Sequence, residues 1–190
     1  MDQVALKQVA ELLAQRNLID EQIARVIGRP ATTGHIGEWI AAQIFGVELH
    51  GSAINCGSDG LFTEPPLAGR SVNVKFYPKR EGNLDMKAPP DTQPDFYLVL
   101  AGPKRPATTS RNSHRPCVIS EVFLFEAAPL VQQLANRGVQ IGGPTSVTIP
   151  AWEAARIHPH SGVGAMPLSQ GQVAALTLFG GASPILATSP

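Results

Sequence analysis

The stretch "SVNVKF", residues 71–76, alternates apolar with polar side chains, which is the pattern of a β-strand. A period of two places Val72, Val74 and Phe76 on one face of this strand, and Asn73 and Lys75 on the other. In an α/β architecture both faces of the sheet are covered, and Asn73 and Lys75 then project side by side into a polar pocket. The alternative is an edge strand that carries its lysine in solvent to prevent pairing with other chains.

Helices are expected before this strand, and further strands on both sides of it. Helical spacing predicts helices over 3–15 and 20–28, and a third helix that Thr33 caps and that ends at Phe45. Strand-like segments separated by glycines follow at 47–54, 59–63, 71–77 and 95–101. After a basic, proline-rich loop at 102–116, we expect a strand over 117–125, a helix over 129–138, a strand over 145–149, and short helices over 151–157 and 170–179, the last capped by Ser169. Antiparallel strands followed by a strand-helix-strand unit predict a mixed α/β fold with one dominant sheet.

Length and composition favour a single domain. The chain has 190 residues, of which 43% are hydrophobic, and this suffices for one core. We expect residues 1–30 to form helices packed on that core, residues 31–179 to form the main domain and residues 180–190 to form a tail. The 15 basic and 15 acidic residues cancel, so no overall field favours nucleic acid or a membrane surface.

The sequence also predicts a cytoplasmic location. The N-terminus has the pattern of an amphipathic helix rather than of a secretory leader, and we expect no membrane span. The two cysteines, Cys56 and Cys117, lack metal-site spacing, and we expect buried or half-buried thiols in a reducing compartment.

Two acidic residues are not explained by local structure. Apolar side chains cover nearly every direction around the third expected helix, so the carboxylate of Glu38 should be largely desolvated. Its burial needs a compensating cation or donor, and a structural ion pair is one solution. Asp59 lies in "CGSDGLF", where Asp-Gly is also typical of a hairpin turn.

Taken together, these residues predict a metal site. The chain carries, in this order, a Glu on an expected helix, an Asp at the end of a following strand, and a strand with a polar residue two positions before a Lys. This is the order of the residues in a metal-dependent phosphodiesterase site. Mg²⁺ binds through one or two carboxylates, waters and substrate phosphate, and Glu38 and Asp59 can supply the carboxylates. Lys75 can orient or deprotonate the attacking water. We therefore expect Glu38, Asp59 and Lys75 to converge in one pocket, with Mg²⁺ or Mn²⁺ as cofactor.

At these residues the chain resembles the PD-(D/E)XK nuclease superfamily. The segments "GHIGEWIAAQIFG", "GSDGLF", "GRSVNVKFYPK" and "PDFYLVLAGP" are similar in order to the motifs of a bacterial family of short restriction-endonuclease-like domains, and the resemblance covers about residues 17–157. It implies an α/β, restriction-endonuclease-like fold, with a mixed central sheet flanked by helices after an N-terminal helical segment. It also implies that Glu38, Asp59 and Lys75 are catalytic and that the backbone carbonyl of Val74 is a further metal ligand. Asn73 departs from the family, because it stands where a second acidic residue is usual, and an amide can coordinate a metal but carries no charge.

Basic residues gather beside the predicted site. From residue 70 to residue 115 the chain carries nine basic and four acidic residues, a local balance of +5. We expect Lys79, Arg80, Lys104 and Arg105 to contact a phosphate backbone. A solvated loop surface is the alternative for such a run of charges.

The leading hypothesis is a Mg²⁺-dependent endonuclease or exonuclease that hydrolyses DNA phosphodiester bonds in restriction, repair or defence against mobile elements. The expected partner is nucleic acid, in the first place DNA, with no membrane partner and with a homodimer left open. The alternative is a catalytically inactive module that keeps the nuclease fold and binds nucleic acid or a partner protein, and Asn73 is the residue that favours it. A helix-turn-helix regulator built from residues 18–45 is a third hypothesis, against which the burial of the third expected helix argues.

Overall fold

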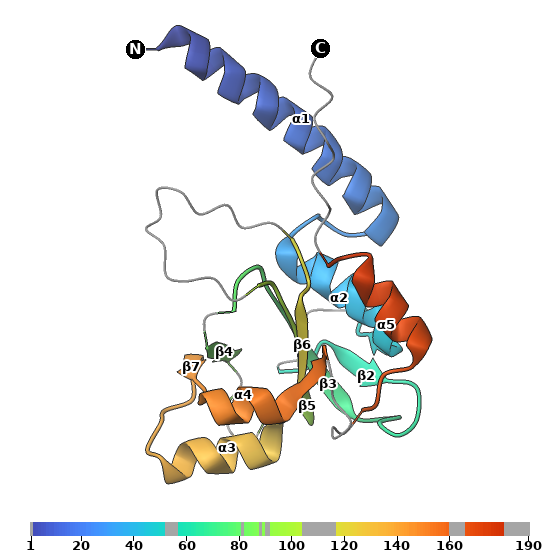
Figure 1. The fold of residues 1–190 in the computed structure, drawn as a ribbon, viewed down its shortest axis with the longest axis vertical. Helices are drawn as coiled ribbons and strands as arrows, with labels where there is room; N and C mark the ends of the chain where they lie inside the picture. Colours follow the sequence, from blue (N-terminus) through green and yellow to red (C-terminus); the bar gives the residue numbers. More distant parts are fainter. Residues whose placement is uncertain are drawn as a thin grey trace.

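The computed structural model describes residues 2–51, 57–80, 82–87, 89, 92–103, 117–159 and 166–180. Within these ranges the chain forms five helices and eight strands, with a six-stranded sheet, a two-stranded sheet and helices on both faces of the larger one (Figure 1). The predicted mixed α/β class with an N-terminal helix is confirmed.

The central sheet is mixed, and the strand that carries "SVNVKF" lies inside it. Its strands follow the order β1-β2-β3-β5-β6-β8. Their bounds are Val47–Leu49, Gly60–Phe62, Ser71–Tyr77, Phe96–Ala101, Glu121–Glu126 and Arg156–His158. β3 and β5 run parallel, and the other neighbouring strands run antiparallel. Because β3 has a hydrogen-bonded neighbour on each side, the edge-strand alternative is wrong.

One face of this sheet is covered by α2 (Thr33–Phe45) and α5 (Gln170–Thr177). The side chain of Thr32, rather than that of Thr33, caps α2 by accepting a hydrogen bond from the backbone N–H of His35. Gly37 permits close packing, since a Cβ at this position would lie 2.7 Å from the Cβ of Phe76 on β3. The inner side of α2 is therefore buried against β3 and is not free to enter a DNA groove as the helix-turn-helix hypothesis requires.

The contact between α5 and α2 is fixed by the capping residues of α5. Ser169 caps this helix as predicted, and Gln172 completes a capping box with it. The side-chain amide of Gln172 also donates to the carbonyl of Ile44 at 2.9 Å, which ties the start of α5 to the last turn of α2.

The opposite face is covered by α3 (Ala127–Asn136), α4 (Ile149–Ala155) and a two-stranded sheet of β4 (Asn83–Met86) and β7 (Gly143–Ser146). Trp152 on α4 presents its ring to Phe123 and Phe125, with centroid distances of 4.7 and 4.9 Å in edge-to-face geometry. Leu84 and Met86 point into the same core and are fully buried. The polar side of β3 therefore faces β4 and not bulk solvent.

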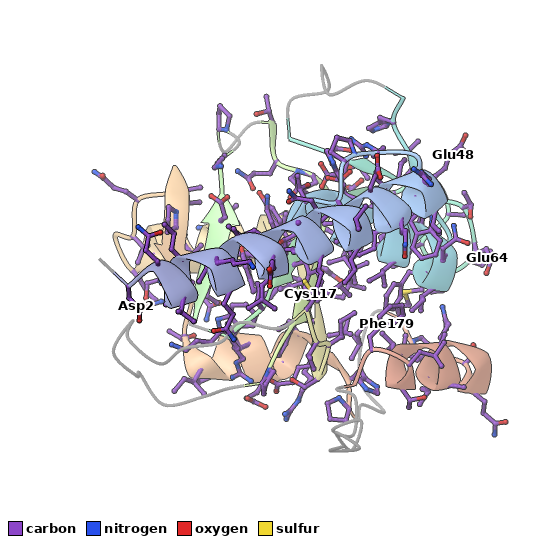
Figure 2. The ribbon with its side chains drawn as sticks, turned by 90° about the horizontal axis from the view of Figure 1, so that it is seen from above. Asp2, Glu48, Glu64, Cys117 and Phe179 are labelled. Atoms are coloured by element: carbon purple, nitrogen blue, oxygen red, sulfur yellow. The ribbon has the colours of Figure 1, made fainter. Side chains whose placement is uncertain are left out.

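The N-terminal segment is one helix, α1 (Gln3–Ile27), rather than the two predicted. Asp20, expected to begin the second helix, lies inside α1 and pairs with Arg16 at 3.5 Å, while Asp2 caps the start and Gly28 ends it in the left-handed conformation. No residue of α1 is buried, and its N-terminal half extends away from the domain (Figure 1). The view from above shows Asp2 at the far end of α1, and Cys117 and Phe179 near the sheet and α5 (Figure 2). The packing of residues 1–30 on the core is thus confined to the C-terminal part of α1.

Other differences concern short elements. The strands expected at 47–54, 59–63 and 145–149 are shorter or shifted, and β4 and β8 were not predicted. The expected antiparallel arrangement is wrong for β3 and β5. These two strands pair in parallel, and β4, which belongs to the other sheet, lies between them in the sequence. Cys117 is exposed and not buried, whereas Cys56, residues 104–116 and residues 181–190 lie outside the described ranges. Within the described ranges, none of the helices combines the length and apolar character that a membrane span needs.

Candidate functional site

The site is built on β3, whose side chains alternate between buried and half-buried positions. Val72, Val74 and Phe76 pack in the core under α2, and the other face carries Asn73 and Lys75, as the sequence predicts. Tyr77 lies on that second face too, and its hydroxyl accepts a hydrogen bond from a backbone N–H of β4 at 2.8 Å. The half-buried space between this face of β3 and β4 is the candidate site.

Asp59 is fixed to β3 at the point where β2 begins. Its backbone N–H donates to the carbonyl of Val72 at 2.8 Å, and its carboxylate accepts from the backbone N–H of Val74 at 2.7 Å. The N–H and C=O of one residue in a strand point to the same side, so the carbonyl of Val74 is directed to the side of β3 on which Asp59 lies. Asp59 and this carbonyl, both predicted metal ligands, are therefore neighbours.

Lys75 lies in a partly buried environment between acidic groups. Burial is the main cause that lowers the pKa of Lys75, and the carboxylates of Asp85 and Asp59 oppose it, in that order. The charge of Lys87 lowers this pKa as well. The charge of Glu38 raises it and has the weakest of the named effects. The pKa of Lys75 is therefore sensitive to the charge of Asp59, which the sequence predicts beside it, and more strongly to that of Asp85, which sequence reasoning missed.

Asp85 lies on β4 and brings a second carboxylate to this space. One carboxylate oxygen, Oδ2, is 3.3 Å from the ammonium of Lys87. The other, Oδ1, is buried and has no hydrogen-bond partner among the described residues. The signal in the sequence is the alternation of "NLDM", residues 83–86, which places Leu84 and Met86 in the core and Asp85 on the other face.

Asn73 has a similar unpaired oxygen. Its amide nitrogen donates to the carbonyl of Gly57 at 3.3 Å, which directs the amide group toward the segment before Asp59. The amide oxygen, Oδ1, is buried, and no donor in the described part of the chain reaches it. A buried acceptor without a donor costs roughly 1–3 kcal/mol, so both Asn73 and Asp85 hold an oxygen that a cation or a donor would stabilise.

Two tyrosines, one half-buried and one fully buried, lie on the same side of the sheet as Asn73 and Lys75. Burial raises the pKa of Tyr77 to about 12, and burial together with the charge of Asp85 raises that of Tyr97 further. Both phenols therefore stay neutral at physiological pH and act as hydrogen-bonding groups rather than as charges. Tyr97 pairs with Asn73 in the register of β3 and β5, and its hydroxyl donates to Gln93.

Glu38 has a partner of its own. Its carboxylate is 18% exposed and forms an ion pair with Arg29, in the turn between α1 and α2. The prediction that this buried acid needs a cation is confirmed, and the cation is the guanidinium of a structural ion pair. No hydrogen bond or ion pair among the described residues joins Glu38 to Asp59 or Lys75, and α2 covers the opposite face of β3.

The described residues offer few groups for a metal ion. No set of three or more His, Cys, Asp and Glu side chains in them is placed to hold one. The available oxygens near Lys75 are two carboxylates, from Asp59 and Asp85, with the amide of Asn73 and the carbonyl of Val74. Mg²⁺ binds through one or two carboxylates with carbonyl oxygens and waters, so this set fits a hard divalent cation by its chemistry.

The four residues predicted to contact nucleic acid lie in different environments. Lys79 lines a pocket of about 330 Å³ beside Asp85 and Lys87. The prediction that Arg80 contacts a phosphate backbone is wrong, because its side chain is only 7% exposed and pairs with Glu121 and Glu153. A guanidinium enclosed in this way cannot reach a phosphate backbone. Lys104 and Arg105 lie outside the described residues.

Comparison with known proteins gives no further guide to this site. No model of a protein family matches the chain, and no curated protein sequence is significantly similar to it.

Proposed function

We propose that this chain is a divalent-metal-dependent nuclease with a restriction-endonuclease-like fold, and that DNA is its substrate. The observation that carries the proposal is that Asn73 and Asp85 each hold a buried oxygen without a hydrogen-bond partner among the described residues, and that Asn73 is two residues from Lys75, whose pKa is lowered by burial. Oxygen atoms of this kind suit a hard cation, and a lysine beside them suits a phosphodiester.

Each residue has a role in this proposal. Asp59, Asp85, the amide of Asn73 and the carbonyl of Val74 would hold Mg²⁺ or Mn²⁺. When bound, the cation would neutralise phosphate charge and lower the pKa of a water molecule. Lys75 orients the attacking water, and its lowered pKa makes it a better partner for proton transfer than a solvated lysine.

Glu38 is left out of this metal set. Its carboxylate is already neutralised by Arg29, and a second cation would have to displace that guanidinium. The proposal therefore replaces the predicted helical carboxylate with Asp85 on β4, while Asp59 and Lys75 keep their predicted roles.

The test is a cleavage assay on supercoiled plasmid and single-stranded DNA with Mg²⁺, with Mn²⁺ and with EDTA. We expect cleavage with either metal, none with EDTA, and loss of cleavage in Asp59→Ala, Asp85→Asn and Lys75→Ala. Glu48→Gln, which removes an exposed carboxylate on β1, is the matched control and should cleave normally. Full activity in Asp59→Ala would refute the site.

A second candidate is a binding module that has lost catalysis. Two observations favour it: Asn73 supplies an amide where the resembled family has an acid, and Glu38 is held in a structural ion pair. Under this alternative neither metal supports cleavage, and Asp59→Ala leaves the affinity for nucleic acid unchanged.

A further inference from the structure

An apolar stripe runs along α1, and among the described residues the domain covers only its C-terminal part. The exposed members are Leu6, Val9, Leu12, Leu13 and Ile19, each of them exposed over more than half of its surface. At about 100° per residue these side chains share one side of the helix with Ile23 and Ile27. The ion pair of Arg16 and Asp20 interrupts the stripe, but apolar side chains gathered on one side of an exposed helix in this way mark an interaction site.

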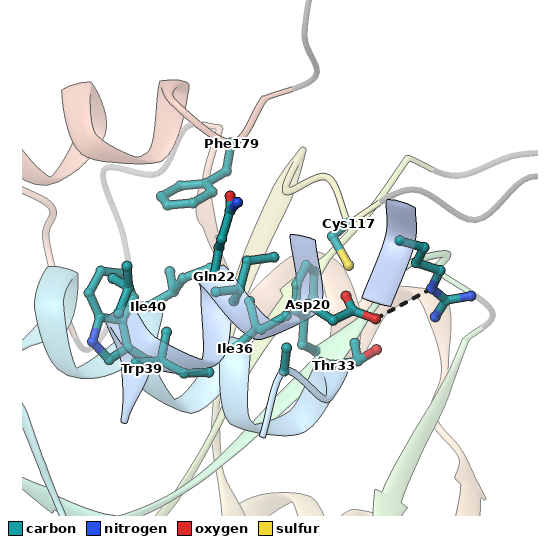
Figure 3. Close-up of a pocket in the computed structure, with 14 residues that line it drawn as sticks. Asp20, Gln22, Thr33, Ile36, Trp39, Ile40, Cys117 and Phe179 are labelled. Carbon is teal, nitrogen blue, oxygen red and sulfur yellow. Dashed lines mark ion pairs between the residues drawn. The ribbon is translucent and has the colours of Figure 1, made fainter. Parts of the chain in front are cut away.

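The stripe continues into a groove. Between the C-terminal half of α1 and α2 lies an open, mainly apolar groove of about 530 Å³. Figure 3 shows Ile36, Trp39 and Ile40 of α2 and Phe179 around it, with the ion pair of Asp20 marked by a dashed line. The groove therefore adds apolar surface to the C-terminal half of the stripe.

We propose that a second copy of this chain covers the stripe and the groove, with the two α1 helices packed antiparallel. A two-fold axis that crosses the helices near Leu13 and Ala14 would lay Leu6 and Val9 of one copy along the groove-lining half of the other. The two-fold axis generates the same contact a second time with the two copies exchanged. Both copies therefore use the same surface, as a two-fold dimer requires. α1 is about 37 Å long, and its N-terminal half extends beyond the domain, which leaves room for the partner helix.

The charges on α1 favour this orientation. In the antiparallel pair Lys7 lies level with the partner's Asp20 and Glu21, and Glu11 lies level with the partner's Arg16. A parallel pair would place like charges level along the whole helix. Several of these residues lie off the stripe, so they favour the orientation through their field rather than through contacts.

The same charges argue against a lipid surface as the occupant. Helices that lie in a membrane interface are rich in Lys and Arg on their polar face. α1 carries three basic and three acidic residues, and Arg16 and Asp20 lie on the apolar side itself. A neutral helix of this kind gains no attraction from anionic lipids.

Sedimentation velocity of the full chain tests the proposal. We expect a dimer in the wild type, a monomer in Leu13→Glu, and a dimer in Leu18→Glu. Leu18 is the matched control, since it is an exposed leucine of the same helix but lies about 140° around the helix from Leu13. A monomeric wild type, a dimeric Leu13→Glu or a monomeric Leu18→Glu would overturn the proposal, as would a monomer that binds anionic vesicles.

Cysteine pairs test the orientation in a Cys56→Ser, Cys117→Ser background. An equimolar mixture of Val9→Cys and Ile19→Cys proteins should give a crosslinked heterodimer on oxidation, and each protein alone should give little homodimer. Efficient crosslinking of Val9→Cys with itself would show a parallel pair and contradict the proposed arrangement.

Discussion

Replacing Arg80 with methionine should destabilise the fold strongly and leave any DNA-binding surface intact. Its guanidinium pairs with Glu121 at 2.8 Å and with Glu153 at 3.1 Å. It also lies over the rings of Phe123 and Trp152, at 5.1 and 5.7 Å from their centroids. Methionine keeps the apolar stem in the core but leaves Glu121, which is 14% exposed, without its closest cation.

Breaking a buried ion pair by removing one partner costs about 3–5 kcal/mol. Arg156 lies 3.5 Å from Glu121 and compensates part of this loss, so we expect the lower part of the range, about 3 kcal/mol. In a domain of this size about 3 kcal/mol corresponds to a fall of roughly 6–12 °C in Tm. Thermal unfolding followed by circular dichroism, with urea unfolding for the free energy, measures both quantities.

Lys79→Met is the matched control, because it removes the neighbouring positive charge by the same substitution. We expect its free energy of unfolding to stay within about 1 kcal/mol of the wild type. Its effect should instead fall on DNA binding, where the slope of log K against log salt should drop by about one. If Arg80→Met unfolds like the wild type and lowers the salt slope, the assignment of Arg80 to a structural ion-pair network is refuted.

Three further predictions concern α2 and the site. Gly37→Ala should cost about 1–3 kcal/mol, because the new methyl group meets Phe76 at 2.7 Å, whereas Gly34→Ala in the same helix meets nothing within 4 Å and should be neutral or stabilising; chemical unfolding of both variants checks this. Because the pKa of Lys75 is lowered in the folded protein, the unfolded chain binds more protons at pH values between that pKa and the ordinary value of 10.5. The free energy of unfolding of the wild type should therefore rise with pH in this window. An equal rise in the free energy of unfolding of Lys75→Met would contradict this. Asn73→Asp adds a negative charge and should strengthen Mg²⁺ binding measured by calorimetry, and weaker binding would count against a cation at this position.

The parts of the fold that local sequence specifies could be predicted. The alternation of residues 71–77 defines β3 to the residue, and the capping side chain of Ser169 defines the start of α5. The sequence predicts two helices where α1 is one, because Asp20 has the chemistry of a helix cap but lies inside a continuous helix and pairs with Arg16. Propensity for a cap is a weak signal where the flanking residues favour a continuous helix.

The parts of the site that depend on distant residues could not be predicted. β4 has four residues and forms by pairing with β7, about 60 positions later in the chain, so the contribution of Asp85 is invisible in local sequence. Arg80 belongs to a run of basic residues, but partners 41 and 73 positions away bury it. Glu38 was correctly expected to need a cation, yet only the turn before α2 reveals that Arg29 supplies it.

Paramagnetic broadening by Mn²⁺ is the most direct test of the central claim, that Asn73 and Asp85 complete a cation site with Asp59 beside Lys75. In amide NMR spectra of the wild type, substoichiometric Mn²⁺ should broaden the signals of Asp59, residues 73–75 and Asp85 first, and EDTA should restore them. The exposed acids Glu11 and Glu21 on α1 report non-specific binding and should stay sharp at the same metal concentration. Broadening that is confined to α1, or that leaves residues 73–75 and Asp85 sharp, would contradict the account.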